Sequence, residues 1–523
     1  MLLHEIVEFA AAATPGRTAL VAGEVRWTFA DLHERVVSMS EGLAGRTSPG
    51  DRVLVVADNT PAVVTALYAV PRAGAVATFA NTRHTPRELL ELVAATDPTV
   101  VLGTAEQLDR LLPELGDRSS VRTVVCLDGP HAGADERARR ALGLADPSAV
   151  AATAPDLGAR PAPVAIDVDD LAWLIHTSGT TGRAKGARLT HRSLLAAVTN
   201  TAIARPMADD DVYLFPFPLF HVAAYNVLHS HLRRCPVVLL PRFDAATVLE
   251  LVPRERVTTC SLAPTMLAML LDHPGRADHD LGSLRQISYG ASAMPLDLLH
   301  RVGRELPHCG LAQGYGMTEL SGNAVFLDPD AHRRAATDVP HLLAAAGRPG
   351  PLVELRIAHD DGRAVEAGAV GEILVRGDQV CDGYWEAPEA SAAARVEGWF
   401  RTGDLGRIDD EGYLYVVDRK KDIIISGGEN VASREVEDVV STHPLVSQVA
   451  VVGVADPVWG ERVCAVVVAN GSGEVDPDEV VAWTDGRLAG FKRPRRVVVV
   501  DALPVNASGK VDKAQVRAAL AEG

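Results

Sequence analysis

Residues 176–186, with the sequence HTSGTTGRAKG, carry the side chains best suited to chemistry in this chain of 523 residues. The segment combines three glycines with two cations and follows a short apolar run at 171–175. Glycines let a loop turn its backbone N–H groups toward one point, and a lysine adds charge, so the pattern indicates a polyphosphate-binding loop after a buried strand. A flexible surface loop is the alternative, and the strand and Lys185 argue against it. The Walker pattern does not fit, because Ala184 stands where that pattern needs a glycine. The four hydroxyl side chains are Thr177, Ser178, Thr180 and Thr181.

Four more glycine-and-charge stretches follow along the chain, and each is a weak signal alone. Their order and spacing together make the chain resemble the adenylate-forming superfamily, which holds acyl-CoA synthetases, beetle luciferases and peptide-synthetase adenylation domains. The resemblance covers nearly the whole chain and is closest to medium- and long-chain fatty acyl-CoA ligases. The stretches are GYGMTE at 314–319, WFRTGDLG at 399–406, DRKKDIIISGGENV at 418–431 and NASGK at 506–510.

The resemblance implies a two-step reaction with ATP, Mg²⁺ and CoA as cofactors. A carboxylate is a poor electrophile, so it first attacks the α-phosphate of ATP, which releases pyrophosphate and gives an acyl adenylate. The CoA thiol then displaces AMP. Catalysis of the first step should come mostly from positioning and charge stabilisation. The expected acid is a medium- or long-chain fatty acid, and an aryl acid is the alternative.

The resemblance also assigns the nucleotide site. Lys185 and the hydroxyls of the first loop would hold the outgoing phosphates, and Tyr315 would offer a flat face to adenine. Asp404 would accept hydrogen bonds from the ribose hydroxyls, with Arg419 beside it; a solvated turn is the plain alternative for Asp404. The remaining positions are Gly179, Gly182, Gly290, Ala291, Ser292, Gly314, Gly316, Met317 and Thr318.

Four residues are expected to be catalytic: Lys510, His221, Glu319 and Thr180. Glu319 and Thr180 would bind Mg²⁺, which prefers oxygen ligands; a helix-cap acid is the alternative for Glu319. Lys510 would bridge the carboxylate and the nucleotide while charge develops at the α-phosphate. His221, in PLFHVAA, would border the acyl tunnel, although a lone histidine among apolar residues is more often a core group.

The distance of Lys510 along the chain from the other motifs implies a switch between the two steps. Once the adenylate exists, the C-terminal domain would swing about Lys421 and remove Lys510 from the site. Gly427, Gly428 and Glu429 would then line a tunnel for pantetheine, where paired glycines allow close backbone approach.

Gly316 bears on the size of the acid. In the resembled family the residue after the motif tyrosine lines the acyl pocket, and acetate-specific relatives carry a tryptophan there. A glycine predicts a tunnel that admits acids larger than acetate or propionate. A tight turn with positive φ is the alternative.

Some positions depart from the family pattern. His176 replaces the common tyrosine before the loop, and Ala184 replaces the usual proline, which should leave the loop less stiff. Ala432 and Ser433 stand where many relatives carry Tyr-Pro. None of these changes removes a catalytic group, so they bear on loop dynamics and substrate preference.

The motifs need an α/β scaffold to position them. Up to about residue 125, helical patterns with caps at Thr28 and Thr85 alternate with Val/Ile/Leu runs, which predicts a largely parallel sheet with helices on its faces. Residues 129–168 predict a long connecting loop, and Thr190 predicts the start of the next helix.

Two domains are predicted: an N-terminal adenylation domain at 1–418 and a mobile C-terminal domain at 419–523 that carries Lys510. Short strands with turns from Pro351 indicate a small β-rich subdomain within the first domain. The element order after 418 fits a compact α/β domain. The predicted fold class is α/β, with a large N-terminal domain of βαβ-type sheets and a small C-terminal α/β domain.

The composition bears on the classes of binding partner and on the cellular location. A net charge of −17 argues against nucleic acid or an anionic membrane as the main partner. No apolar run of about 18 residues occurs, and acids near the start do not suit a signal peptide, so a cytoplasmic enzyme is predicted. The six cysteines have no metal-ligand spacing and are expected to be reduced thiols.

Three other functions stay open. One is an adenylating enzyme that loads a carrier protein or another nucleophile, although no carrier domain follows residue 523. The second is a luciferase-type oxygenase, and the third is a nucleotide-binding protein with a decayed site. Intact Lys185, Glu319, Asp404 and Lys510 argue against decay. A homodimer is kept as a possible assembly.

Overall fold

The computed structural model divides the chain into two compact units. Unit 1 comprises residues 1–354 and 376–394, and unit 2 comprises 355–375 and 395–523. Unit 2 groups the small β-rich segment with the C-terminal part of the chain, whereas the predicted boundary at 418/419 follows the family hinge and stays a prediction. The structure describes residues 1–115, 120–129, 131, 164–177, 185–290, 294–506 and 510–522.

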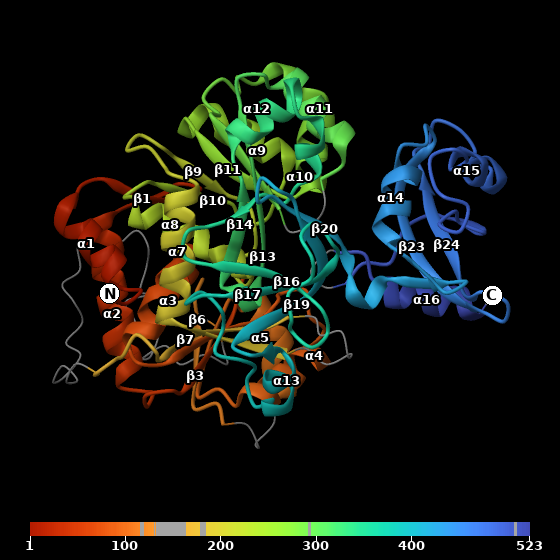
Figure 1. Ribbon diagram of the computed structural model, residues 1–523. Coiled ribbons are helices and arrows are strands. Elements are labelled where there is room, and N and C mark those ends of the chain that lie inside the picture. The colour runs from red at the N-terminus through yellow and green to blue at the C-terminus, as the bar shows by residue number, and fades with distance from the viewer. Residues whose placement is uncertain are drawn as a thin grey trace. The chain divides into compact units, whose positions relative to one another are not determined.

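The larger sheet of unit 1 has nine strands in the order β15-β14-β13-β12-β11-β9-β10-β1-β2 (Figure 1). The strands from β13 to β1 run parallel, whereas β2, β14 and β15 pair antiparallel at the two edges. The strands are β1 (Thr18–Ala22), β2 (Val25–Thr28), β9 (Tyr213–Phe215), β10 (Val237–Leu239), β11 (Thr259–Leu262), β12 (Gln286–Gly290), β13 (Gly310–Met317), β14 (Gly322–Leu327) and β15 (Arg348–Pro349).

The second sheet of unit 1 has six strands in the order β6-β5-β3-β4-β7-β8. All neighbours run parallel except β7 and β8. The predicted βαβ rhythm and the buried strand before the first loop are confirmed here. The strands are β3 (Arg52–Val56), β4 (Val76–Phe79), β5 (Val100–Gly103), β6 (Thr123–Cys126), β7 (Leu171–Thr177) and β8 (Lys185–Thr190).

Local side-chain chemistry starts the helices of unit 1. Thr28, Thr85 and Thr190 each accept a hydrogen bond from the backbone N–H three residues later, as the sequence predicts. These helices are α1 (Glu5–Ala13), α2 (Phe29–Ala44), α3 (Pro61–Arg72), α4 (Pro86–Thr96), α5 (Ala105–Leu111), α7 (His191–Ala204), α8 (Tyr225–Leu232), α9 (Ala245–Glu255), α10 (Pro264–Asp272), α11 (Leu296–Glu305), α12 (Pro329–Thr337) and α13 (Pro388–Ala393).

Helix α3 runs through Pro71, although a proline usually ends a helix. A proline within a helix leaves the carbonyl four residues earlier without its usual donor. Here that carbonyl belongs to Leu67, and it accepts a hydrogen bond from Trp173 Nε1 at 3.1 Å. The indole of β7 thus replaces the missing donor and lets the last turn of α3 form.

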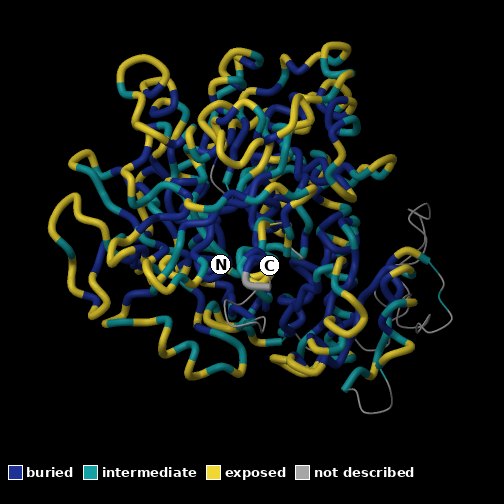
Figure 2. Tube along the Cα trace, turned by 90° about the vertical axis from the view of Figure 1, so that its right-hand side faces the viewer, coloured by how far each residue is buried: buried dark blue, intermediate teal, exposed yellow. Residues whose placement is uncertain are grey.

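Unit 2 contains two five-stranded sheets, one of them covered by helices on both faces. Along β23 and β24 alternate residues belong to two separate buried cores, as the two-residue period of a strand requires. Figure 2 colours the whole described chain by burial, with buried residues in dark blue. Within the described chain no helix is long and apolar enough to cross a membrane. The elements are β16 (Glu354–Ala358), β17 (Gly371–Arg376), β18 (Arg395–Val396), β19 (Trp399–Ile408), β20 (Leu414–Arg419), β21 (Ile424–Ser426), β22 (Glu429–Val431), α14 (Ser433–Ser441), β23 (Val446–Asp456), β24 (Gly460–Ala469), α15 (Pro477–Trp483), β25 (Arg496–Val500) and α16 (Lys513–Glu522).

Candidate active site

The predicted phosphate loop joins two antiparallel strands of unit 1. Thr177 ends β7, Lys185 begins β8, and the two residues are partners in the register of that pair. Thr177 Oγ1 donates to the carbonyl oxygen of Lys185 at 3.4 Å. The strand pair therefore fixes both ends of the loop. The predicted loop residues Ser178, Gly179, Thr180, Thr181 and Gly182 lie outside the described residues.

His176 packs its ring against Gly186 on the neighbouring strand. A Cβ atom at Gly186 would lie 2.9 Å from His176 Nε2, so the ring occupies the space that a side chain would need. Burial lowers the pKa of His176 to about 4. The histidine is therefore neutral near pH 7 and adds no positive charge beside Lys185.

The glycines of the adenine-side motifs are needed because backbones approach closely. Gly290 of β12 and Gly314 of β13 are parallel neighbours, and a Cβ atom at Gly290 would lie 2.5 Å from the Gly314 carbonyl oxygen. Tyr315 follows on β13, which ends at Met317. The predicted residues Ala291 and Ser292 lie outside the described residues.

Gly316 requires a correction. A Cβ atom there would overlap the carbonyl oxygen of Gly322 on the antiparallel strand β14. A side chain at Gly316 would therefore meet the backbone of β14, and the expectation that the residue borders the acyl tunnel stays a prediction. The alternative of a turn with positive φ is wrong, since Gly316 is not among the residues with positive φ. A tryptophan at this position would break the β13–β14 pairing.

Glu319 lies just past the carboxyl end of β13, in the 3-10 helix η4 (Thr318–Leu320), and is only 8% exposed. The hydroxyl of Tyr384 donates to Glu319 Oε1 at 3.1 Å. Lys185 Nζ lies 5.4 Å from the centroid of the Tyr384 ring. Tyr384 thus contacts two motif residues that are far apart in sequence. Sequence reasoning missed it, because the contact of Tyr384 with Glu319 joins residues 65 positions apart in the chain.

The donor set at Glu319 fits a hard cation held jointly with phosphate. Among the described residues, no group of three or more His, Cys, Asp or Glu could hold a metal by protein ligands alone. Mg²⁺ is commonly bound through one or two carboxylates together with substrate phosphates. A buried carboxylate near a lysine at the base of a phosphate loop suits that mode.

His221 begins the 3-10 helix η2 (Val222–Ala224), which leads into α8. Its Nδ1 accepts a hydrogen bond from the Ala223 backbone N–H at 3.3 Å. Tyr225 follows on α8 and is 2% exposed. A Cβ atom at Gly322 would lie 2.9 Å from Tyr225 Cε1, so this ring fills the space beside the start of β14.

In unit 2 the predicted ribose-binding residues are cross-strand neighbours. Asp404 on β19 pairs with Arg419 on β20, and Arg419 Nε lies 3.6 Å from Asp404 Oδ1. Asp404 is 7% exposed, and its backbone N–H donates to Thr402 Oγ1 at 3.1 Å. The structure therefore places the two predicted ribose-binding side chains, Asp404 and Arg419, next to each other.

The predicted hinge residue Lys421 lies in the 3-10 helix η6 (Lys420–Asp422) between two anchored neighbours. Lys420 Nζ donates to Asp360 at 2.6 Å and to Glu372 at 3.2 Å, both in the small β-rich segment. Arg517 of α16 donates to Asp422 at 2.9 Å. Residues on either side of Lys421 thus contact different parts of unit 2, and the role of Lys421 as the hinge stays a prediction.

Lys421→Pro should slow thioester formation by about tenfold or more while adenylation is largely kept, because proline fixes φ near about −65° where a hinge must change its dihedrals. The two half-reactions are measured separately by pyrophosphate release and by transfer from supplied acyl adenylate to CoA. Lys421→Ala, which leaves the backbone free, isolates the contribution of the side chain. Equal rates in both half-reactions for wild type and Lys421→Pro would place the pivot elsewhere.

The predicted pantetheine residues form a tight hairpin between β21 and β22. Gly427 and Gly428 have φ of 62° and 83°, the signature of a two-residue turn that favours glycine. The Gly427 N–H donates to the Trp459 carbonyl oxygen at 2.7 Å, and a Cβ atom at Gly427 would lie 2.9 Å from the Trp459 ring. Glu429 begins β22. Sequence reasoning missed Trp459.

Lys510 lies in an exposed loop before α16. Its backbone N–H donates to Asn506 Oδ1 at 3.1 Å, and its carbonyl oxygen accepts from the Asn506 N–H at 2.8 Å. These two bonds with Asn506 hold the backbone at Lys510.

Comparison with family models decides the assignment. The model described as AMP-binding enzyme matches residues 7–385, and the model described as AMP-binding enzyme C-terminal domain matches residues 435–510. The chain belongs to the AMP-binding enzyme family. The predictions of the adenylate-forming superfamily, of its fold class and of an AMP-forming acid–thiol ligase are confirmed.

Individual relatives align with this AMP-binding enzyme over nearly its whole length. It is 38% identical to a feruloyl-CoA synthase from an Amycolatopsis species, with 96% of each chain covered. It is 34% identical to the long-chain-fatty-acid–CoA ligase FadD13 of Mycobacterium tuberculosis, with 94% of this chain and 93% of the relative covered. Its structure is similar to that of the amide bond synthetase McbA from Marinactinospora thermotolerans, with a TM-score of 0.87, 31% identity and 99% of both chains covered.

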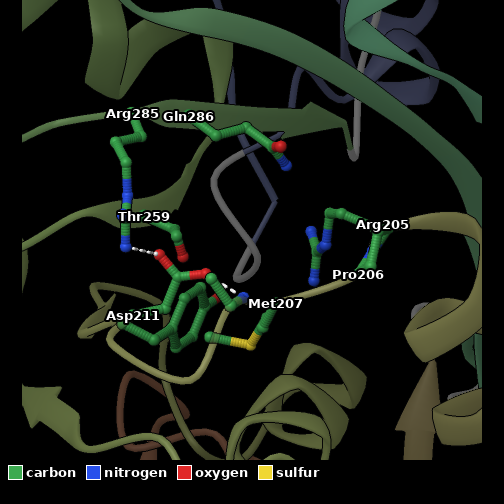
Figure 3. A pocket seen from close by; sticks show the side chains of 9 residues that line it. Arg205, Pro206, Met207, Asp211, Thr259, Arg285 and Gln286 are labelled. Carbon is green, nitrogen blue, oxygen red and sulfur yellow. Dashed lines mark hydrogen bonds and ion pairs between the residues drawn. The ribbon is translucent and has the colours of Figure 1, made fainter.

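A separate cavity of about 150 Å³ lies in unit 1 of this AMP-binding enzyme, away from the motif residues (Figure 3). It is lined by the first residues of three parallel strands: Tyr213, Thr259 and Gln286. Ligands of open α/β sheets bind at the carboxyl ends of the strands, where Gly290 and Glu319 lie. The cavity therefore lies at the amino-terminal ends of the strands, whereas the candidate active site lies at their carboxyl ends.

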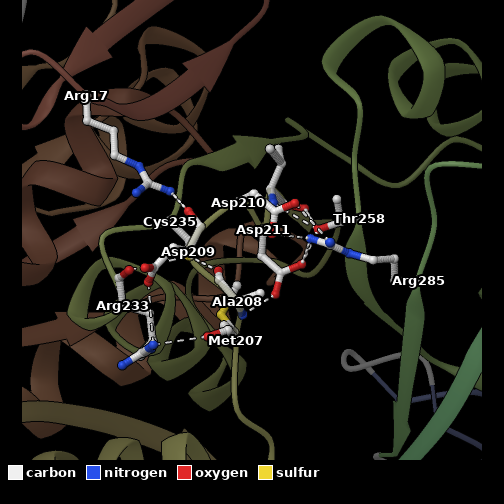
Figure 4. A network of polar contacts seen from close by, with 11 residues as sticks. Arg17, Met207, Ala208, Asp209, Asp210, Asp211, Arg233, Cys235, Thr258 and Arg285 are labelled. Atoms are coloured by element: carbon white, nitrogen blue, oxygen red, sulfur yellow. Dashed lines mark hydrogen bonds and ion pairs between the residues drawn. The ribbon is translucent and has the colours of Figure 1, made fainter.

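A polar network closes the sheet edge beside this cavity (Figure 4). Arg285 donates to Asp210 and Asp211, and Thr258 Oγ1 donates to Asp211 at 2.6 Å. Asp211 is 5% exposed, and its charge is balanced within this network. We interpret this network as one that stabilises the amino-terminal ends of β9, β11 and β12.

Proposed function

We propose that this AMP-binding enzyme is an ATP-dependent CoA ligase that converts a ring-bearing carboxylic acid to its CoA thioester through an acyl adenylate. The observation that carries the first step is the linked position of Lys185, Tyr384 and Glu319 beside the phosphate loop. It links Lys185, at the end of a loop whose composition suits polyphosphate, to a buried carboxylate.

The proposed residue roles rest on the family resemblance and on the charge of each side chain. Lys185 and Thr177 with the loop hydroxyls hold the phosphates, and Asp404 with Arg419 holds the ribose. Glu319 would hold Mg²⁺, which when bound neutralises phosphate charge. Lys510 stabilises the negative charge that develops at the α-phosphate.

The acid is proposed to carry a ring because the chain is more similar to feruloyl-CoA synthase, at 38% identity, than to the fatty acid ligase FadD13, at 34%. His221 begins the segment that carries Tyr225 and is proposed to border the carboxylate. A medium- or long-chain fatty acid, the preference from sequence, is the second candidate.

CoA is the proposed acceptor because unit 2 offers an aromatic and cationic face beside the predicted pantetheine turn. Trp459 contacts Gly427 and is 36% exposed, and the Arg495 guanidinium carbon lies 3.9 Å from its ring centroid. An aromatic ring and a cation suit the base and phosphates of CoA. The likeness to an amide bond synthetase keeps an amine acceptor as the alternative.

The acid class is tested by pyrophosphate release across ferulate, phenylacetate, octanoate, palmitate and acetate, with and without CoA. Ring-bearing acids should give the highest kcat/KM, and mass spectrometry should find the thioester only when CoA is present. Faster turnover of palmitate or octanoate than of every ring-bearing acid would favour the fatty acid ligase instead. A cytoplasmic location, a homodimer, and a mobile domain beginning at residue 419 are proposed on the family resemblance.

A further inference from the structure

Tyr384 contacts both charged motif residues of the proposed phosphate and metal site. Its hydroxyl donates to Glu319 Oε1 at 3.1 Å, and its ring faces the Lys185 ammonium at 5.4 Å. One rigid side chain therefore serves a carboxylate with its polar end and a cation with its aromatic face.

The backbone of Tyr384 is held on both sides. Residues 382–385 add to the edge of β8, with Tyr384 opposite Ala187 and the Trp385 N–H donating to the Gly186 carbonyl oxygen at 2.7 Å. The Tyr384 N–H donates to Ser391 Oγ at 2.8 Å. The ring is thereby fixed to the strand that begins at Lys185.

The same segment is also tied to the carbonyl of Glu319. The Cys381 N–H donates to the Glu319 carbonyl oxygen at 2.7 Å. The segment 381–385 thus fastens the end of β13 to the start of β8, two strands that belong to different sheets of unit 1. The distance between Lys185 and Glu319 depends on this tie.

A buried carboxylate and a nearby lysine have a simpler arrangement available, which is a direct ion pair. Such a pair would consume the lysine charge that a phosphate needs and the carboxylate oxygens that a cation needs. The Tyr384 hydroxyl satisfies the carboxylate with a neutral donor, which leaves its negative charge in place.

We propose, on the basis of the proposed function, that Tyr384 is a positioning residue of the adenylation step that holds Glu319 ready for Mg²⁺ and keeps it apart from Lys185. It acts through Glu319 and is not itself a group that reacts.

The test uses Tyr384→Phe, which keeps the ring under Lys185 and removes only the hydroxyl. ATP binding by the full chain is measured by titration calorimetry without any acid, once with Mg²⁺ and once with EDTA. The variant should lose roughly tenfold of the Mg²⁺-dependent gain in ATP affinity, the scale for one hydrogen bond to a charged group, with affinity in EDTA unchanged. ATP–pyrophosphate exchange with an accepted acid should fall in parallel.

Tyr213→Phe is the matched control, because its buried hydroxyl donates to Ser261 Oγ at 2.9 Å at the opposite edge of the sheet. Tyr213→Phe should show the wild-type Mg²⁺-dependent gain in ATP affinity. Its change in melting temperature should be similar to that of Tyr384→Phe. A wild-type Mg²⁺-dependent gain in ATP affinity in Tyr384→Phe would overturn the positioning role. Equal losses of ATP affinity with Mg²⁺ and with EDTA would overturn it as well. If wild type itself showed no exchange with any acid, the proposed function would fall and the role of Tyr384 with it.

Discussion

Lys510→Ala should lower the rate of adenylation by about 10²-fold or more, the scale for loss of one preorganised charged donor. Both hydrogen bonds that tie Lys510 to Asn506 are made by the backbone of Lys510, so truncation of the side chain removes the charge and leaves these bonds in place. Pyrophosphate release in the presence of an accepted acid measures this step.

The second half-reaction separates the role of Lys510 from a general defect. Chemically supplied acyl adenylate should still react with CoA at close to the wild-type rate in Lys510→Ala. Lys492→Ala is the matched control, since Lys492 is paired with Glu435 at 2.7 Å in the same unit and has no proposed role in adenylation. If both half-reactions fell together in Lys510→Ala, the assignment to the first step would be wrong.

Glu319→Gln should reduce Mg²⁺-dependent adenylation by about 10²-fold, because an amide keeps the shape of the side chain and removes the charge that a hard cation needs. The amide oxygen can still accept from Tyr384, so the fold around η4 should persist. Rates are measured against Mg²⁺ concentration, with melting temperature as the check on folding.

Glu305→Gln provides the control for Glu319. Glu305 is a carboxylate of α11 that pairs with Arg276 and Arg301 and has no proposed role in adenylation. It should affect stability slightly and leave the Mg²⁺ dependence unchanged. A Glu319→Gln enzyme with the wild-type Mg²⁺ dependence would remove Glu319 from the metal site.

Sequence reasoning succeeded where the physical cause is local. The helix starts at Thr28, Thr85 and Thr190 depend on a hydrogen bond three residues away, and such bonds are visible in a short window. The Asp404–Arg419 pair was placed by motif resemblance, and the antiparallel register of β19 and β20 confirms that the two are neighbours.

The features that sequence reasoning did not predict depend on contacts between residues far apart in the chain. Tyr384 meets Glu319 across 65 residues, and Trp459 meets Gly427 through strands that pair only in the folded unit. The antiparallel edges of both sheets in unit 1 depend likewise on pairings that no local pattern encodes. The close approach of the β14 backbone to Gly316 is likewise a contact that the sequence alone cannot place.

The central claim is that the carboxylate attacks the α-phosphate of ATP, and oxygen transfer tests it most directly. An accepted acid labelled with ¹⁸O in its carboxylate is turned over with ATP, Mg²⁺ and CoA, and the products are analysed by mass spectrometry. Thiolysis of an acyl adenylate cleaves the bond between the acyl carbon and the bridging oxygen, so AMP should carry one ¹⁸O atom and pyrophosphate none. Label in inorganic phosphate with release of ADP, or unlabelled AMP alongside a formed thioester, would contradict the account.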